Sequence, residues 1–231
     1  GYVKLTSQNF IVFFDCASVG PTYQPGHGHA DNLSVEISGV EDRIFVNTGV
    51  SDYAEGFVRL YERSTRAHNT ISVNGRNSSD IWKAFRVGRR AKTSVEAFEC
   101  HDPQPTFVEA WHDGYQVLKG VGNHFRRVDT ADDCLTITDS LDGSGVHWIE
   151  TFWFLHPEVA VIKKIEKCVT LKVKSRLYEF SALSNNCCLD LVESYWAESF
   201  YQRTPSTCIV LKGYERLPLT RSYTLSRKMK P

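Results

Sequence analysis

The feature that most constrains the fold of this 231-residue chain is a succession of short apolar segments separated by turns. Apolar and polar side chains alternate along most of them, which is the period of a β-strand with one buried face. No segment has the period of a long amphipathic helix. The pattern predicts an all-β fold, a large sandwich of antiparallel sheets. The expected strands are residues 9–16, 33–37, 43–46, 70–73, 95–98, 106–111, 125–128, 135–139, 148–155, 159–165, 169–173, 208–211 and 223–225.

Local signals refine this interpretation at a few places. Segments 33–37 and 43–46 flank a short turn and are expected to form a hairpin. Asn74-Gly75 is the dipeptide most typical of a two-residue hairpin turn. Segment 9–16 is continuously apolar, which predicts a strand buried on both faces. A short helix or ordered excursion is expected near residue 57, with one face formed by Tyr53, Phe57, Leu60 and Tyr61.

Length and composition indicate one globular domain over residues 1–231. No change in composition marks a linker, and no repeat of 20 to 50 residues indicates a propeller or solenoid. No run of about 18 apolar residues is present, so no membrane span is expected. Lys plus Arg and Asp plus Glu both number 27, and this balance argues against a nucleic-acid partner because no global positive field is present.

The seven cysteines are scattered and lack a Cys-x-x-Cys spacing, so neither a disulfide framework nor a cysteine zinc site is expected. Reduced and mostly buried thiols are the default expectation. The neighbours Cys187 and Cys188 leave a redox role open beside simple core packing. Met229 is the only methionine, so we expect the chain to be a processed form or a piece of a longer protein.

The densest group of functional side chains lies in the first third of the chain. His27 and His29 are two residues apart, so in an extended segment their side chains share one face. Imidazole is the commonest metal ligand and also titrates near neutral pH. Two interpretations remain open at this point. Either His29, His68 and an oxygen donor such as Asn47 or Asp31 hold a metal, or hydrogen-bonded histidines brace a loop.

Residues 83–92 contain five basic side chains, among them Arg89. The planar guanidinium of arginine matches carboxylate and sulfate groups, so this stretch is a candidate for contact with an acidic polymer. A solvated face of a strand is the alternative.

Four motifs within residues 26–91 resemble the C-terminal β domain of the heparinase II/III-like polysaccharide lyases. They are G-H-G-H-A-D-N-L-S, R-I-F-V-N-T-G-V-S-D-Y, E-R-S-T-R-A-H-N-T-I-S-V-N-G and F-R-V-G-R-R-A. The tract is also similar to the related oligoalginate lyases. The resemblance implies a two-domain parent enzyme with an N-terminal α/α toroid that this chain lacks. It further implies cleavage of a uronic-acid-containing acidic polysaccharide by β-elimination.

The resemblance also implies a metal, usually zinc, held by His29, His68 and the residue at position 47. The family usually has Asp at that position, whereas this chain has Asn47. An asparagine removes one negative charge, so zinc is expected to bind less tightly unless Asp31 compensates.

The expected catalytic residues are His27, which corresponds to a residue at the cleft, and Tyr53, which falls near a tyrosine that some relatives use as acid or base. Tyrosine has a pKa of about 10, so Tyr53 needs a neighbouring cation such as Arg63 or His27 to act as a base at neutral pH. We also expect Arg63 and Arg89 to bind the acidic substrate.

The expected partners are therefore an acidic polysaccharide or oligosaccharide and the N-terminal toroid, with no nucleic acid and no membrane. Relatives take an Asn, a His and a Tyr from the toroid, so the chain alone is expected to be inactive. The resemblance implies a periplasmic or secreted parent, and the scattered cysteines leave a cytoplasmic location open. A noncatalytic carbohydrate-binding or scaffold module is the alternative, and Asn47 keeps open an intact fold that has lost its activity.

Overall fold

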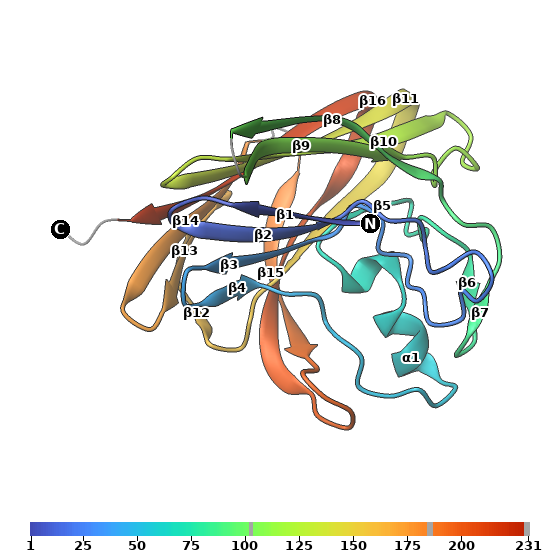
Figure 1. The fold of residues 1–231 in the computed structure, drawn as a ribbon, viewed down its shortest axis with the longest axis horizontal. Helices are drawn as coiled ribbons and strands as arrows, with labels where there is room; N and C mark the ends of the chain where they lie inside the picture. Colours follow the sequence, from blue (N-terminus) through green and yellow to red (C-terminus); the bar gives the residue numbers. More distant parts are fainter. Residues whose placement is uncertain (102–103, 184–186, 229–231) are drawn as a thin grey trace.

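The computed structural model describes residues 1–101, 104–183 and 187–228, and Met229 lies outside this part. Two antiparallel sheets pack face to face in a sandwich, which confirms the expected fold class (Figure 1). The smaller sheet has the strand order β1-β2-β3-β4, formed by β1 (Tyr2–Thr6), β2 (Phe10–Asp15), β3 (Val35–Gly39) and β4 (Arg43–Phe45).

The larger sheet has the order β12-β13-β14-β16-β11-β10-β9-β8, with β15 paired to β16 and β5 paired to β11. Its two longest strands, β11 and β16, pair along most of their length. The bounds are β5 (Ile71–Val73), β8 (Thr93–His101), β9 (Gln104–His112), β10 (Val121–Thr130), β11 (Cys134–Phe154), β12 (Val159–Ile165), β13 (Cys168–Val173), β14 (Arg176–Leu183), β15 (Cys188–Trp196) and β16 (Thr204–Lys228).

The remaining elements lie together at one end of the sandwich (Figure 1). They are the helix α1 (Phe57–Glu62), a 3₁₀ turn (Thr65–Ala67) and a small ribbon of β6 (Ile81–Trp82) and β7 (Arg86–Val87). In the described part of the chain, no helix is both long and apolar enough to cross a bilayer.

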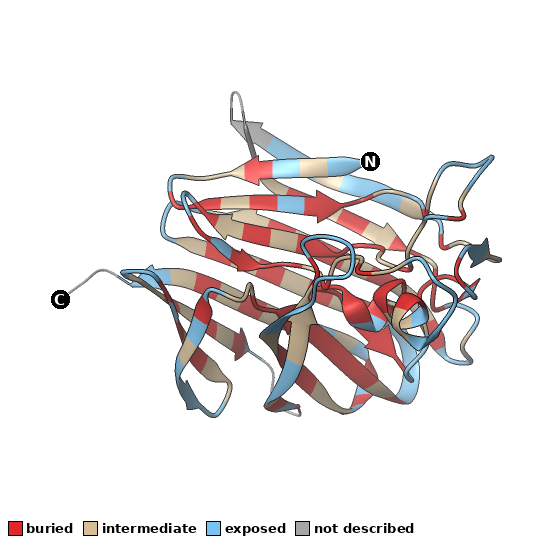
Figure 2. Cartoon of the chain, turned by 90° about the horizontal axis from the view of Figure 1, so that it is seen from below, coloured by how far each residue is buried: buried red, intermediate tan, exposed pale blue. Residues whose placement is uncertain are grey.

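The core lies between the two sheets and follows from the alternation seen in the sequence. Buried and exposed positions alternate along the strands of both sheets (Figure 2). Val12 and Ile37 of the smaller sheet belong to the same buried apolar cluster as Trp153, Phe180 and Leu225 of the larger sheet. Each such side chain contributes about 1.5 to 3 kcal/mol when it leaves water, so this cluster is the main source of stability.

A charged group is also buried in this interior. Arg126 donates from Nε and Nη2 to the two carboxylate oxygens of Asp139, each at 2.7 Å. Its Nη1 donates to the carbonyl oxygens of Leu33 at 2.8 Å and of Asn69 at 2.6 Å. Burial alone would raise the pKa of Asp139, but Arg126 and His124 hold it well below its usual range. Arg126 thereby connects the larger sheet to the loop that leads into β3 of the smaller sheet and to the segment that precedes β5.

Two buried histidines extend this group. The Gly114 N–H donates to His112 Nδ1 at 3.0 Å, so the proton of His112 is on Nε2. His112 Nε2 then donates to His124 Nδ1 at 3.0 Å, and His124 Nε2 donates to Asp139 at 2.7 Å. Burial lowers the pKa of both histidines, so both are neutral at pH 7.

Several expectations from the sequence are confirmed. The hairpin of β3 and β4 is present, and Asn74 and Gly75 have positive φ angles of 51° and 66°, as a tight turn of this kind requires. The six cysteines whose side chains are described are free, and they include Cys187, which is buried, and Cys188, which is exposed.

Other expectations were wrong. Segment 9–16 is not buried on both faces, because Phe13 of β2 is 48% exposed. The helix α1 forms where expected, but its buried face consists of Arg59 and Glu62, and Phe57 is 83% exposed. The expected strands did not include β1, the short β6 and β7, β14 or β15. Arginine and glutamate are rarely buried, so the spacing of the apolar residues gave no sign of this orientation.

The buried ion pair predicts a large effect of a small substitution. Asp139→Asn leaves Arg126 charged and uncompensated in the interior, so the free energy of unfolding should fall by about 3 to 5 kcal/mol in urea denaturation. The control is Asp129→Asn, which removes a partly exposed partner of Arg127 and should cost less than about 1 kcal/mol. Equal, small losses in both variants would show that the pair does not hold the fold together.

Candidate functional site

A loop between β2 and β3 carries His27, His29 and Asp31, and buried hydrogen bonds fix its path. The Ala30 N–H donates to Arg63 O at 2.9 Å, and Thr65 Oγ1 donates to Ala30 O at 2.6 Å. Arg63 itself donates from Nε and Nη2 to Gly28 O, at 3.1 and 3.0 Å. The loop is therefore held against the end of α1 and the 3₁₀ turn that precedes His68.

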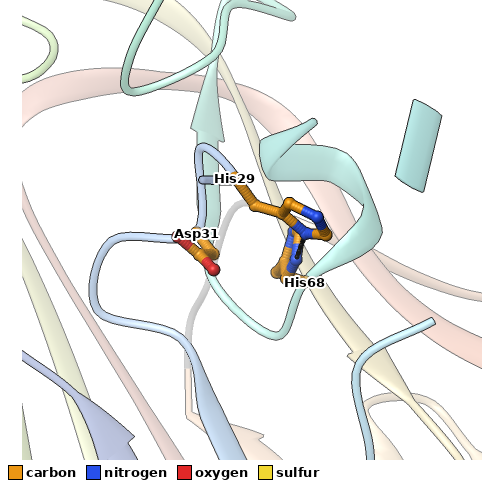
Figure 3. Close-up of side chains that lie close together, drawn as sticks. All are labelled: His29, Asp31 and His68. Atoms are coloured by element: carbon orange, nitrogen blue, oxygen red, sulfur yellow. Dashed lines mark hydrogen bonds between the residues drawn. The ribbon is translucent and has the colours of Figure 1, made fainter. Parts of the chain in front are cut away.

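His29, Asp31 and His68 come together at this place (Figure 3). The ligand atoms of the three side chains all lie within 4.8 Å of one another, and His29 Nδ1 is 3.1 Å from His68 Nε2. Nitrogen ligands lie about 2.0 to 2.1 Å from zinc, so two of them on a tetrahedral ion are about 3.3 Å apart. The observed spacing thus needs only a small opening to accept the ion.

The charge states of the side chains suit a metal, but the His29 tautomer does not: Arg59 Nη1 can only donate to His29 Nε2, 3.3 Å away, so His29 carries its proton on Nδ1, the nitrogen nearest His68. His68 Nδ1 lies 2.7 Å from Ser64 O and therefore carries the proton, which leaves the lone pair of Nε2 directed toward His29. Burial lowers the pKa of His68 to about 4 and that of His29 well below its usual value, so both imidazoles are neutral at pH 7. Desolvation raises the pKa of Asp31 to about 7, and a neighbouring cation would restore its charge. Two neutral imidazoles and one carboxylate are a donor set that fits zinc.

The side-chain amide of Asn47 is hydrogen-bonded to other groups of the protein. Its Oδ1 accepts a hydrogen bond from the Asn69 N–H at 3.0 Å, and its Nδ2 donates to Glu36 Oε1 at 3.4 Å. Both ends of the amide therefore have protein partners. Asp31, the second of the oxygen donors that the sequence offered, is a carboxylate within reach of both histidines.

The predicted catalytic pair is in contact. The ring centroids of His27 and Tyr53 are 5.3 Å apart, and both rings pack against Phe85, at 5.2 and 5.7 Å. Phe200 covers Tyr53 from another side at 4.9 Å. Tyr53 is 39% exposed, so its ring is fixed by aromatic contacts while part of it stays accessible.

Arg59 connects this pair to the candidate metal ligands, and the sequence did not reveal it. Its guanidinium lies 4.8 Å from the centroid of the Tyr53 ring, and its Nη1 is 3.3 Å from His29 Nε2. Its Nη2 is buried and has no hydrogen-bond partner among the residues that the structure describes. The i,i+4 spacing of Arg59 and Arg63 in the sequence was the available signal, since such residues share one helix face.

The two arginines expected to bind substrate differ in their positions. Arg63 is fully buried, and besides Gly28 it donates to the carbonyl oxygens of Lys83 and Arg86. A side chain in this position does not contact a polymer at the surface. It anchors the turn between β6 and β7 instead. Arg89 is partly exposed and lies 3.3 Å from Ser78 O, and its role in substrate binding stays a prediction.

Two surface hollows meet at His27. One, of about 580 Å³, is lined by Tyr2, Asp15, Asp31 and His29 among others. The other, of about 630 Å³, is lined by the basic side chains Lys83 and Arg86, with Phe85, Glu55 and Gln24. His27, one of the two side chains expected from the sequence to do chemistry, therefore lies beside openings large enough for a sugar unit.

A family model described as heparinase II/III-like, C-terminal, matches residues 1–224. The chain belongs to this family. The expected resemblance is thereby confirmed, while the similarity to oligoalginate lyases stays a prediction. No curated protein sequence matches the chain.

Solved structures agree in fold. The heparan sulfate lyase HepC from Pedobacter heparinus is similar with a TM-score of 0.74 and 13% identity, over 100% of this chain and 37% of that chain. A heparinase III structure gives a TM-score of 0.73 and 16% identity, over 94% of this chain and 33% of that one. The chain thus spans about a third of the length of these proteins. The 4-α-glucanotransferase of Thermococcus litoralis, with a TM-score of 0.54, 10% identity and coverage of 99% and 37%, shows that the sandwich alone does not determine the chemistry.

A zinc centre predicts a measurable stabilisation. At a concentration about a hundred times Kd, zinc should raise Tm by roughly 5 to 10 °C, because the ion binds the folded state only. His29→Ala or His68→Ala should remove this increment in differential scanning calorimetry. His156→Ala is the matched control, since His156 packs on Trp196 outside the cluster. Stabilisation that is equal in all variants would reject the centre.

Proposed function

We propose that this chain forms the β-sandwich half of the cleft of a polysaccharide lyase that cleaves a uronic-acid-containing polysaccharide by β-elimination. An N-terminal α/α toroid of the parent protein would form the other half. The observation that carries the proposal is the contact of His27 with Tyr53, beside Arg59 and the cluster of His29, Asp31 and His68. Family membership and the likeness to a heparan sulfate lyase support the choice of reaction and of an acidic substrate.

The reaction needs a base, an acid and a means to stabilise negative charge. A base removes the proton from C5 of the uronate, and the electron pair is delocalised onto its carboxylate. The pair then forms the C4–C5 double bond as the bond from C4 to the glycosidic oxygen breaks, and an acid protonates that oxygen. The products are an unsaturated uronate and a shortened chain.

Tyr53 is the proposed proton-transfer residue of this half of the cleft. Its ring is fixed between Phe85 and Phe200, which holds the hydroxyl in one position. The guanidinium of Arg59 lies 4.8 Å from the centroid of the ring and places a positive charge beside it. Arg59 thus takes the role that the sequence suggested for Arg63.

The surroundings of His27 supply the remaining functions. His27 lies at the edge of the Tyr53 ring and lines both hollows, so it can orient a sugar unit or exchange a proton with it. Lys83 and Arg86 line the hollow beside it and can bind a carboxylate or sulfate of the substrate.

The proposed metal ligands are His29, Asp31 and His68. A bound zinc ion would supply a positive charge near the cleft and would link the loop before β3 to the segment after the 3₁₀ turn. The three side chains come from these two segments, and binding one ion would hold the segments together. This is a bracing role, and the proton transfers belong to Tyr53 and His27.

The proton-transfer role predicts the kinetics of one variant. In the full-length parent, Tyr53→Phe should lower kcat at least about a hundredfold with little change in KM, because the ring packing remains and only the hydroxyl is lost. The assay is the ultraviolet absorbance of the unsaturated product. Tyr214→Phe, on the exposed surface of β16, is the control. An unchanged kcat for Tyr53→Phe would exclude the hydroxyl from the chemistry, and a parent that binds the polymer without any absorbance change would be a noncatalytic binding module.

The basic hollow predicts a different kinetic change. Replacing Lys83 and Arg86 with Ala should raise KM about tenfold or more and leave kcat nearly unchanged, because charge contacts formed equally in the bound and transition states affect binding alone. Arg76→Ala, an exposed cation on the Asn74-Gly75 turn, should leave both constants unchanged. An unaltered KM in the double variant would place the substrate's acidic group elsewhere.

A further inference from the structure

The amide of Asn47 bridges two elements next to the candidate metal centre. The backbone N–H of Asn69, the residue after His68, donates to Asn47 Oδ1 at 3.0 Å. On its other side, Asn47 Nδ2 lies 3.4 Å from the carboxylate oxygen Oε1 of Glu36 in β3. The Asn47 amide can make both contacts because it has a donor and an acceptor, whereas a carboxylate has acceptors only.

Glu36 is held in place at its other oxygen. Arg43 in β4 donates from Nη2 to Glu36 Oε2 at 2.9 Å, and the Arg43 guanidinium also lies 5.2 Å from the centroid of the Trp196 ring. The pair leaves Oε1 directed at the Asn47 amide. Both partners are partly exposed, so solvent screens the Glu36 charge without removing it.

The charge of Glu36 acts on the centre. Glu36 is connected to the centre through the Asn47 amide, which binds the backbone N–H of Asn69, the residue after His68. A negative charge near the centre favours a cation bound there. The hydrogen bond from Asn47 Nδ2 to a charged acceptor further polarises the amide and makes Oδ1 a stronger acceptor.

We propose that Glu36 and Asn47 are a charge-exchanged pair, in which Glu36 carries the negative charge that the metal centre lacks at position 47. Glu36 is a positioning residue that acts through the amide and does not itself ligate the ion. An aspartate at position 47 would place a second carboxylate about 3.4 Å from the first, and like charges at such a distance repel strongly. The observed packing therefore accommodates a carboxylate at one of these two positions but not at both, and in this chain it is at position 36. The inference rests on the metal centre proposed above.

The test is a double-mutant cycle in the full-length protein, with Glu36→Gln, Asn47→Asp and the double variant. Zinc affinity is measured by competition with a chromophoric chelator, and Tm is measured separately in EDTA. Glu36→Gln alone should weaken zinc binding by about tenfold, the effect of roughly 1.4 kcal/mol. Asn47→Asp should change the affinity less than about threefold when Glu36 is present and tighten it more than about tenfold when residue 36 is glutamine.

The measurement in EDTA tests the pair without the ion. Asn47→Asp should lower Tm when Glu36 is present and should not lower it in the Glu36→Gln background. Glu109→Gln is the matched control, because Glu109 is a partly exposed strand residue that faces Arg127 at 3.9 Å, and it should not alter the effect of Asn47→Asp.

The outcomes separate the two proposals. If zinc binds and His68→Ala abolishes binding, but the effects of Glu36→Gln and Asn47→Asp are additive in both measurements, the charge exchange is overturned and the centre stands. If zinc does not bind the unaltered protein, the centre fails and the assignment of Glu36 to it fails as well. Coupling in both measurements supports the charge exchange.

Discussion

The structure depends on one buried interaction, the ion pair between Arg126 and Asp139. An ion pair enclosed by apolar side chains is favourable only when its remaining donors are also satisfied, and here Arg126 reaches the carbonyl oxygens of Leu33 and Asn69. Those two carbonyls belong to the loops that precede β3 and follow His68. The pair on the larger sheet therefore fixes the segments from which the candidate metal ligands project. The apolar core supplies stability, and this polar group specifies the position of the loops.

The fold class could be predicted from the sequence because a half-buried strand imposes a period of two on its side chains. The missed strands show the limit of this signal. β14 has a regular burial alternation in the structure, but charged residues stand among its apolar ones in the sequence, and β15 is partly exposed along its middle. The orientation of α1 could not be predicted, because tertiary partners bury Arg59 and Glu62 and the period of the apolar residues carries no information about such contacts. Strand pairing between distant segments, such as β11 with β16, is likewise set by packing of the whole chain.

Part of the candidate site could be predicted, because residue types and short spacings are visible in the sequence whereas contacts between distant segments are not. His27, His29 and His68 stood out because histidine is uncommon and their spacing is short or familiar, and Tyr53 is in contact with His27 as expected. Contacts that join separate loops could not be read from spacing. Arg59 reaches both Tyr53 and His29, whereas Arg63 turns inward to bind backbone carbonyls, although the i,i+4 spacing of the two arginines is that of residues on one helix face.

The central claim is that one end of this sandwich is a preformed half of a sugar-acid cleft, with a cation centre beside the pair of His27 and Tyr53. Anomalous diffraction at the zinc edge, from crystals of the full-length protein soaked with an acidic oligosaccharide, tests this directly. The account predicts an anomalous peak among His29, Asp31 and His68, with a sugar unit in contact with Tyr53. A peak elsewhere, or a sugar bound on another face with this end covered by protein, would contradict it.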